Sequence, residues 1–377
     1  MAIGRRTSLL VAGAVLLAAS AAVHALVSGG EGHALATGPS PYSLQLDAPA
    51  GRLFVSTGYS DSAITVFDST NGRRIALVNT PGSPGFVGLG PGGHGAVVAT
   101  DGGQSHYLVD PHGGVRRLST DQAVTPDTTA SHWVYDRLAT TPSWPMQVGN
   151  AVLEVRAEGD PTQLSLSLKR PGHPADRVTL PASTFLGLAA DEGAQRLLLL
   201  GNGPVLFVLD TSTGRLLRQV SLPADTSFMV LDRASHRVYA ADIDSGVVTI
   251  VDSRTGTVLR TERVGNHPDA LAVDERHHHL FVALEGTEHC PSPRAEMGSG
   301  CYPNEDGQVI ELGADGTRLR TWDIGGVPNA LTVDPATGHL FVLDQGEARP
   351  WWLPGWLDEW WFYRVTGSRR VVMLSTT

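Results

Sequence analysis

Acidic and amide side chains recur at one position along the chain, at or just after the end of a predicted strand. They are Asp101, Asn202, Asp242, Glu285 and Asp344. Oxygen atoms are the ligands that a hard cation such as Ca²⁺ prefers, so the four acids are candidate cation ligands and Ca²⁺ is the candidate cofactor. Carboxylates in this place can also act as general bases. A third alternative is that these residues only cap loops and face solvent.

Histidines form a second group with metal-binding chemistry, beginning with the run His277-His278-His279. One repeat position, just before a predicted strand, is assigned to His94, His236, His279 and His339. A residue that recurs in this way is more typical of a turn than of a metal ligand, so no firm metal site is predicted. His267, in a Gly-x-x-Pro loop expected on the opposite face, is the better candidate for a site.

Cys290 and Cys301 are the two cysteines of the chain, and they lie in one segment. Outside the reducing cytoplasm such a pair is expected to form a disulfide. Closing this small loop would contribute about 2–3 kcal/mol in the chain-entropy model. The alternatives are a reactive thiol pair or a metal site. With His289 as neighbour, however, the two sulfurs lack the fourth ligand of a closed zinc site.

Tryptophans are concentrated near the C-terminus. Five of the eight in the chain are Trp351, Trp352, Trp356, Trp360 and Trp361. Their rings could pack over the edge of the fold, contact another protein, where Trp is enriched, or meet a membrane interface or a carbohydrate. These five residues are the candidates for partner binding.

The elements that would position these residues are short strands, which recur with a period of roughly forty residues. The second strand of each unit is found at Gly51–Ser56, Gln195–Leu200, His236–Ala240, His279–Val282 and His339–Val342. The third strand ends in Asp-Ser/Thr-x-x-Gly, a hairpin in which Gly supplies a positive φ. Each unit reads as four strands, termed A to D here, and such units are typical of propeller blades.

These repeats resemble the YVTN family of β-propeller repeats. The resemblance rests on a strand that ends in Asp, as in Leu271-Ala-Val-Asp274, and on Val248-Thr-Ile-Val-Asp252-Ser-Arg-Thr-Gly256. It covers nearly all of residues 38–345, patchily at 84–182. The resemblance implies a propeller and implies little about function. Family members range from surface-layer and binding proteins to subunits of quinone-cofactor amine dehydrogenases.

The strand spacing predicts an all-β chain, a seven-bladed β-propeller of four-stranded antiparallel blades formed by residues 38–377. Blade three is assigned to residues 130–182, and the ring has six blades if residues 119–182 are not a blade. Blade seven is expected to end in its own strand D at Arg370–Leu374. Little exchange of strands between the termini is therefore expected.

Two insertions are predicted in B–C loops, at residues 286–307 and 344–360. In a propeller the D–A and B–C loops emerge on one face of the ring, and the A–B and C–D turns emerge on the other. Both insertions should therefore rise from the same face on neighbouring blades. Long loops on a compact scaffold are often functional.

Residues 1–36 are interpreted as an export signal or an N-terminal membrane anchor with a short linker. Arg5 and Arg6 precede the apolar stretch Ser8–Val27, and both Val23-His24-Ala25 and Ala34-Leu35-Ala36 are candidate cleavage triplets. An uncut stretch of this length can also span a bilayer. The chain is therefore expected outside the cytoplasm, whether secreted, periplasmic or anchored.

The net charge and the absence of known catalytic motifs argue against several classes of function. The formal net charge of −10 and the absence of a long Lys/Arg run argue against nucleic acid as a partner. Neither a Gly-x-Ser-x-Gly elbow nor a His-Glu-x-x-His motif is present. The leading hypothesis is a non-catalytic extracytoplasmic binding scaffold that contacts a protein or cell-envelope partner through the face with the insertions. The alternative is a propeller enzyme or enzyme subunit, lactonase-like or quinoprotein dehydrogenase-like, with a cation or cofactor at the mouth of the central channel.

Overall fold

The computed structural model describes most of the chain after residue 31. The described residues are 32–37, 41–57, 62–100, 105–119, 122, 124–125, 127, 129–132, 145–157, 163–182, 185–202, 204–286, 288–289, 302–303, 307–345 and 369–376. No helix in these ranges has the length and hydropathy that a membrane span requires.

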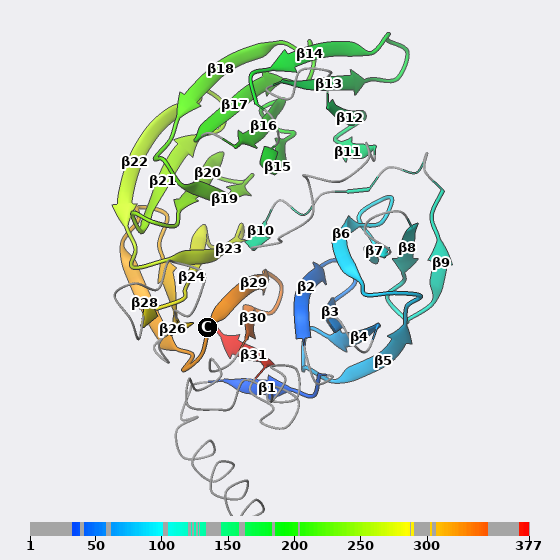
Figure 1. Cartoon of the computed structure of the whole chain (residues 1–377), viewed down its shortest axis with the longest axis vertical. Coiled ribbons are helices and arrows are strands. Elements are labelled where there is room, and N and C mark those ends of the chain that lie inside the picture. Colours follow the sequence, from blue (N-terminus) through cyan, green and yellow to red (C-terminus); the bar gives the residue numbers. More distant parts are fainter. Residues whose placement is uncertain are drawn as a thin grey trace, which may run out of the picture.

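Seven four-stranded antiparallel blades surround a central channel, which confirms the predicted all-β, seven-bladed propeller (Figure 1). The innermost strands A are β2 (Pro41–Asp47), β6 (Gly85–Leu89), β11 (Met146–Val148), β15 (Phe185–Asp191), β19 (Thr226–Asp232), β23 (Pro268–Asp274) and β29 (Pro328–Asp334). Strands B are β3 (Arg52–Thr57), β7 (Ala96–Thr100), β12 (Ala151–Ala157), β16 (Arg196–Gly201), β20 (Arg237–Asp242), β24 (His279–Leu284) and β30 (His339–Asp344).

The outer half of each blade consists of strands C and D. Strands C are β4 (Ala63–Asp68), β8 (Ser105–Val109), β13 (Leu164–Lys169), β17 (Val205–Asp210), β21 (Val247–Asp252), β27 (Gln308–Leu312) and β31 (Arg370–Ser375). Strands D are β5 (Arg74–Asn79), β9 (Val115–Arg117), β14 (Asp176–Leu180), β18 (Leu216–Ser221), β22 (Thr257–Arg263), β28 (Arg318–Asp323) and β1 (His33–Leu35).

Blade three is regular, but it begins later than predicted, at Met146 of β11. The predicted start at residue 130 was wrong because β10 (Ala130–His132) belongs to another blade. It pairs antiparallel with β23, opposite Ala270–Ala272, and gives blade six a fifth strand on its inner edge. The chain between blades two and three thus enters the central channel before it returns to the ring (Figure 1).

The expectation about ring closure was also wrong. The stretch at Arg370 is strand C of blade seven, and the outer strand D is β1 from the N-terminus, with His33 opposite Met373 and Leu35 opposite Val371. Blade seven is therefore built from both ends of the chain. A three-residue strand carries no recognisable alternation, which is why sequence patterning missed it.

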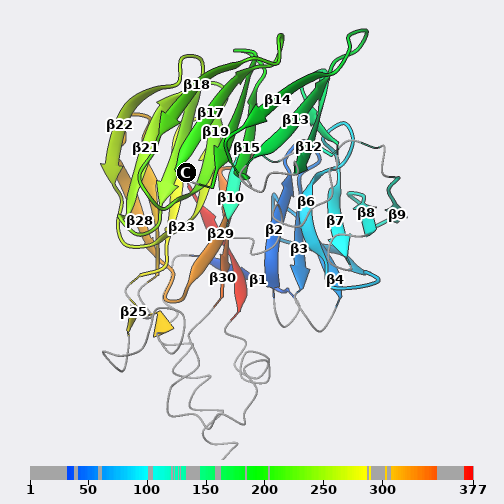
Figure 2. The same ribbon diagram turned by 45° about the horizontal axis from the view of Figure 1, so that its top comes forward.

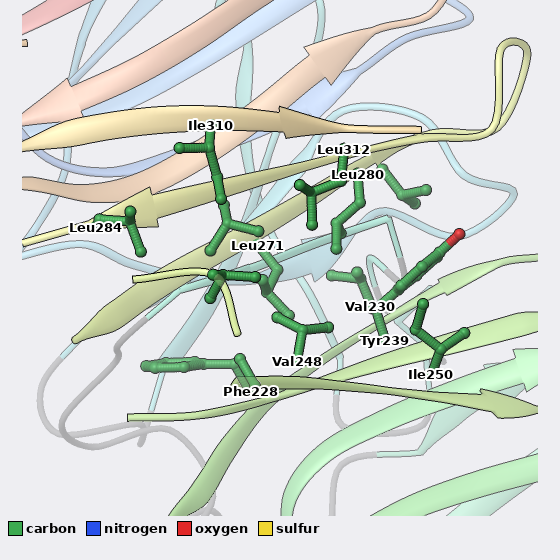
Figure 3. Close-up of a cluster of buried hydrophobic side chains, with 14 residues drawn as sticks. Phe228, Val230, Tyr239, Val248, Ile250, Leu271, Leu280, Leu284, Ile310 and Leu312 are labelled. Carbon is green, nitrogen blue, oxygen red and sulfur yellow. The ribbon is translucent and has the colours of Figure 1, made fainter. Parts of the chain in front are cut away.

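Each blade is apolar on both faces because each face is covered by a neighbouring blade. In β24, Leu280–Leu284 are between 0% and 6% exposed. Figure 3 shows such an interface between blades five and six, where side chains from β19 and β21 pack against β23, β24 and β27; they include Phe228, Val230, Val248, Ile250, Leu271, Leu280 and Ile310. Burying one such Leu or Phe side chain stabilises a fold by about 1.5–3 kcal/mol.

Buried aspartates at the ends of strands A connect neighbouring blades. Asp191 of blade four is 1% exposed and accepts hydrogen bonds from His236 Nδ1, at 2.7 Å, and from the Ser253 hydroxyl, both in blade five. Asp232 in turn lies 2.8 Å from Nδ1 of His278 in blade six. At the closure, the Ser69 hydroxyl of blade one donates to Asp334 of blade seven at 2.6 Å.

This network explains the histidines and corrects their alignment. His236 and His278 occupy the same position, a turn residue with φ of 57° in each. His279, the first residue of β24, instead has Nδ1 2.7 Å from Glu311 Oε1. His339 begins β30 and lies with Nδ1 2.9 Å from the Ser69 carbonyl oxygen. His236 and His278 are therefore turn residues that connect neighbouring blades. His279 and His339 instead begin strands; His279 contacts its own blade, and His339 contacts blade one.

Arginines on strands D add a second set of contacts between blades. Arg218 donates to the Thr255 carbonyl at 3.0 Å, Arg260 to that of Asp315 at 2.6 Å, and Arg320 to that of Ser375 at 3.2 Å. In every case the acceptor lies at the C–D end of the next blade. Each of these contacts therefore joins the outer strand of one blade to the next blade.

Substitution of Asp191 by Ala should lower the free energy of unfolding by about 2–4 kcal/mol, because buried donors of His236 and Ser253 lose their acceptor. Urea unfolding measures this directly. The control is Asp315→Ala, an exposed turn residue whose carboxylate accepts from Thr317 of the same turn and whose backbone carbonyl is kept in the variant, so stability should change little. Equal effects of the two substitutions would contradict the proposed connecting role of Asp191.

Candidate functional site

The ring has one elaborated face, here named the insertion face, where strands A begin and strands B end. Pro268 pairs with Leu284 on this face in blade six, and Pro328 pairs with Asp344 in blade seven. The chain leaves Leu284 and returns at Gln308, and it leaves Asp344 and returns at Arg370. Both long connections therefore start from the same face on neighbouring blades.

Asp242 and Asp344 lie on the insertion face, and both are 1% exposed. Asp242 accepts hydrogen bonds from the backbone N–H groups of Asp225 and Ser245, each at 2.7 Å. Asp344 accepts from the Val327 N–H and from Arg370 Nε, each at 3.0 Å. Both carboxylates thus hold the D–A loop that leads into their own blade. This is the loop-capping alternative of the sequence analysis.

Glu285 follows β24, and its N–H donates to the His267 carbonyl at 3.1 Å. Its charge, together with burial as the larger cause, raises the pKa of Asp269 to about 7. Asp269 sits on β23 at an irregularity in register between Pro268 and Ala270. The sequence patterns did not predict this carboxyl pair. The only signal for it was Asp269, an acid at the second position of strand A.

The other oxygen-bearing candidates are less informative. Asn202 directly follows β16 on the insertion face, and Asp101 lies outside the described residues. Across the described ranges, no three His, Cys, Asp or Glu side chains are grouped so that they could hold a metal ion. The predicted calcium ligands come from different blades, and those seen in detail already have protein partners.

The histidine candidates separate by face. His267 lies beside Pro268 on the insertion face, as predicted, with a positive φ of 46°. The triplet at 277–279 lies on the opposite face, and each ring contacts a different carboxylate. His277 lies 2.7 Å from Asp274 Oδ2, while His278 and His279 contact Asp232 and Glu311.

The tryptophan candidates and both cysteines lie outside the described residues. Of the blade-six insertion, the structure describes a small ladder of β25 (Glu288–His289) and β26 (Tyr302–Pro303), in which His289 pairs with Tyr302. Figure 2 shows β25 beyond the end of the blades. Because His289 precedes Cys290 and Tyr302 follows Cys301, the ladder brings the segments flanking the predicted disulfide together.

The segment Val124–His132, of which the structure describes part, is named the strap here and lies against the inner strands of several blades. Thr125 pairs with Leu89 of β6 and Val124 bridges to Met146 of β11, so the strap joins blades two and three. Its last part, β10, lies against the inner strands β19, β23 and β29. The channel mouth that the cation hypothesis requires is thus partly lined by this strap.

Asp127 anchors the strap in the channel. Its carboxylate accepts hydrogen bonds from Gln45 Nε2 of β2 at 2.9 Å and from the Thr129 N–H and hydroxyl at 3.0 and 2.9 Å. Burial raises the pKa of Asp127, although these hydrogen bonds oppose the shift.

Comparisons with known proteins identify the fold and no family. No protein-family model matches the chain, and no curated protein matches its sequence. Among solved structures it is similar to Raptor of Chaetomium thermophilum, with a TM-score of 0.58 and 12% identity over 92% of this chain. The chain spans 29% of the length of that Raptor chain. At this identity the likeness shows the propeller fold alone, a fold that many unrelated functions share.

Asp242→Ala and Asp344→Ala should each lower the free energy of unfolding by about 1–3 kcal/mol, because the donors that hold each carboxylate lose their acceptor. The loss should be the same in EGTA and in millimolar calcium. Thermal unfolding in both buffers measures this, with Asp244→Ala, an exposed acid of the same loop as Asp242, as control. Stabilisation of the wild type by calcium that disappears in both variants would show instead that these residues bind a cation.

Asp127→Asn should raise the free energy of unfolding at neutral pH. A carboxyl whose pKa is raised by folding binds its proton more tightly in the folded state, so stability falls as pH rises from the ordinary Asp value of about 4 through the raised value. Asn has the same shape and never ionises, so this pH dependence should flatten. Its Oδ1 can still accept from Thr129, and Gln45 can accept from its amide nitrogen by turning its own carboxamide oxygen toward it.

Urea unfolding between pH 4 and pH 8 measures the effect of Asp127→Asn. Asp315→Asn is the control. The Thr317 hydroxyl lowers the pKa of Asp315, so this substitution should change the pH dependence of stability in the opposite direction. A stability curve for Asp127→Asn that parallels the wild type at every pH would contradict the prediction.

Proposed function

We propose that this protein is an extracytoplasmic binding scaffold that contacts a protein or a cell-envelope component through its insertion face. The observation that carries the proposal is that both long connections, 285–307 and 345–369, leave neighbouring blades on one face. Loops that rise from a rigid scaffold are the usual place for recognition.

The opposite face supports the same assignment because its polar side chains are already engaged. The A–B and C–D turns there contain the Asp191, His236 and Ser253 network and its equivalents, which connect blade to blade. A partner on that face would compete with contacts that stabilise the ring.

The N-terminal strand also leaves the insertion face accessible. Within β1, His33 pairs with Met373 and Leu35 with Val371, and β31 runs from Arg370 at the insertion face to Ser375 at the other face. The chain therefore enters β1 from the side of the turns.

The partner chemistry is proposed from the insertions. The blade-seven insertion contains Trp351, Trp352, Trp356, Trp360 and Trp361, and tryptophan often dominates the binding energy of protein interfaces. A disulfide between Cys290 and Cys301 would hold the neighbouring insertion in one shape.

Nucleic acid is not proposed as a partner, given the net charge of −10. Membership of the YVTN repeat family is proposed on the repeat motifs.

A propeller enzyme is the second candidate, and the Asp269–Glu285 pair favours it. A carboxyl with a pKa near 7 is suited to general acid or base catalysis at neutral pH. A lactonase-like hydrolase would add a cation at the channel mouth, and a quinoprotein-like dehydrogenase would add an organic cofactor. Bound calcium by elemental analysis, or cofactor absorbance in the protein from its own host, would support this candidate.

Deletion of residues 348–359, bridged by Gly and Ser, should abolish binding to isolated cell envelope or to a co-purifying protein while thermal unfolding is unchanged. The matched control replaces exposed leucines on the outer rim with Ser, Leu259→Ser and Leu319→Ser, which are 50% and 51% exposed. These should leave binding intact. Binding that survives the deletion, or that is lost only in the rim variants, would contradict the proposed surface.

A further inference from the structure

We infer that the export signal is cut at the Val23-His24-Ala25 triplet and not at Ala34-Leu35-Ala36, so that the mature protein retains residues 32–37 as part of its fold. The inference rests on the proposed export of the chain. Both triplets have the small residues that a signal peptidase requires, and the sequence alone does not choose between them. The structure does, because the second triplet overlaps a strand of the propeller.

The second triplet forms most of the closing strand. Ala34 and Leu35 belong to β1 and pair with Val372 and Val371 of β31. Ala36 follows directly, and the Thr37 N–H donates to the Leu35 carbonyl at 2.8 Å. A cut after Ala36 would therefore remove all three paired residues and leave β31 as an unpaired edge, which is a liability for any sheet.

Leu35 also joins blade seven to blade one. It is 5% exposed and belongs to an apolar cluster with Phe67 of β4, Phe341 of β30 and Val371 of β31. The cluster lies where the first and last blades meet. Loss of Leu35 would weaken the interface that keeps the ring closed.

Two glycine positions, Gly72 and Gly32, have no room for a side chain because β1 and its partner strand β31 pack closely there. A Cβ added at Gly72, in the C–D turn of blade one, would lie 2.6 Å from Leu35 Cδ2. A Cβ added at Gly32 would lie 2.5 Å from Val372 Cγ1 and 2.7 Å from Leu374 Cδ2. The close fit thus begins one residue before β1. A cut at Ala25 lies upstream of all these contacts and removes none of them.

The mature N-terminus of the protein isolated from its own host tests the inference. Intact-mass measurement and N-terminal sequencing should give a start at Leu26. A start at Thr37 would overturn the inference, and so would a chain that keeps residues 1–25. Cell fractionation, performed separately, tests export itself, so failure of the proposed location is distinguishable from a wrong cleavage site.

Two purified chains test the structural basis independently of export. Residues 26–377 and residues 37–377, both without the signal, are compared by thermal unfolding. The shorter chain should unfold roughly 5–10 °C lower or fail to fold, and a synthetic peptide of residues 26–37 should restore the melting temperature of a folded shorter chain. Equal melting temperatures would overturn the inference.

Point variants of the longer chain distinguish strand closure from mere length. Leu35→Asp places a charge in the cluster between blades seven and one and should reproduce the loss seen in the shorter chain. His33→Ser changes an exposed residue of the same strand and should melt like the unmodified longer chain. A Leu35→Asp variant as stable as His33→Ser would contradict the role assigned to β1.

Discussion

Every blade of this propeller depends on its two neighbours, because both of its faces are apolar and neither can be covered within the blade. Strand B of blade six, with no residue from Leu280 to Leu284 more than 6% exposed, illustrates how complete this coverage is. An open ring would expose two such faces at once. Ring closure is therefore the constraint on which the rest depends, and β1 meets it because the N-terminal segment that leads into blade one is also the outer strand of blade seven, paired with the C-terminal strand β31.

Polar contacts between blades follow the same logic. The ends of strands A carry buried aspartates such as Asp191 and Asp232, whose charge would be costly without partners. Turn histidines and a serine of the next blade supply those partners. The contacts run around the ring in one direction and occupy the turn face. On the other face, loops can lengthen without disturbing these connections.

The central channel is shaped by a segment that is not a blade at all. The strap from Val124 to β10 links blades two and three and then lies along blade six, with Asp127 held by Gln45 of blade one. An acid at the channel mouth, such as Asp269, consequently sits in a lower-dielectric place than an open pore would provide. Its raised pKa follows from that burial and from Glu285.

The sequence by itself determined the repeat, the blade number and the face from which the insertions rise, because apolar runs and Asp-Ser/Thr-x-x-Gly turns are local patterns that a blade shows without its neighbours. It also located Asp242 and Asp344 on the insertion face. Only the tertiary structure decided what those carboxylates bind, since their donors, Asp225 and Val327, are backbone N–H groups, which every residue but proline has and which no sequence pattern marks. It alone decided the places of β1 and β10 as well. Three-residue strands have too few side chains to show a period, and their position depends on which edges the completed ring leaves unpaired.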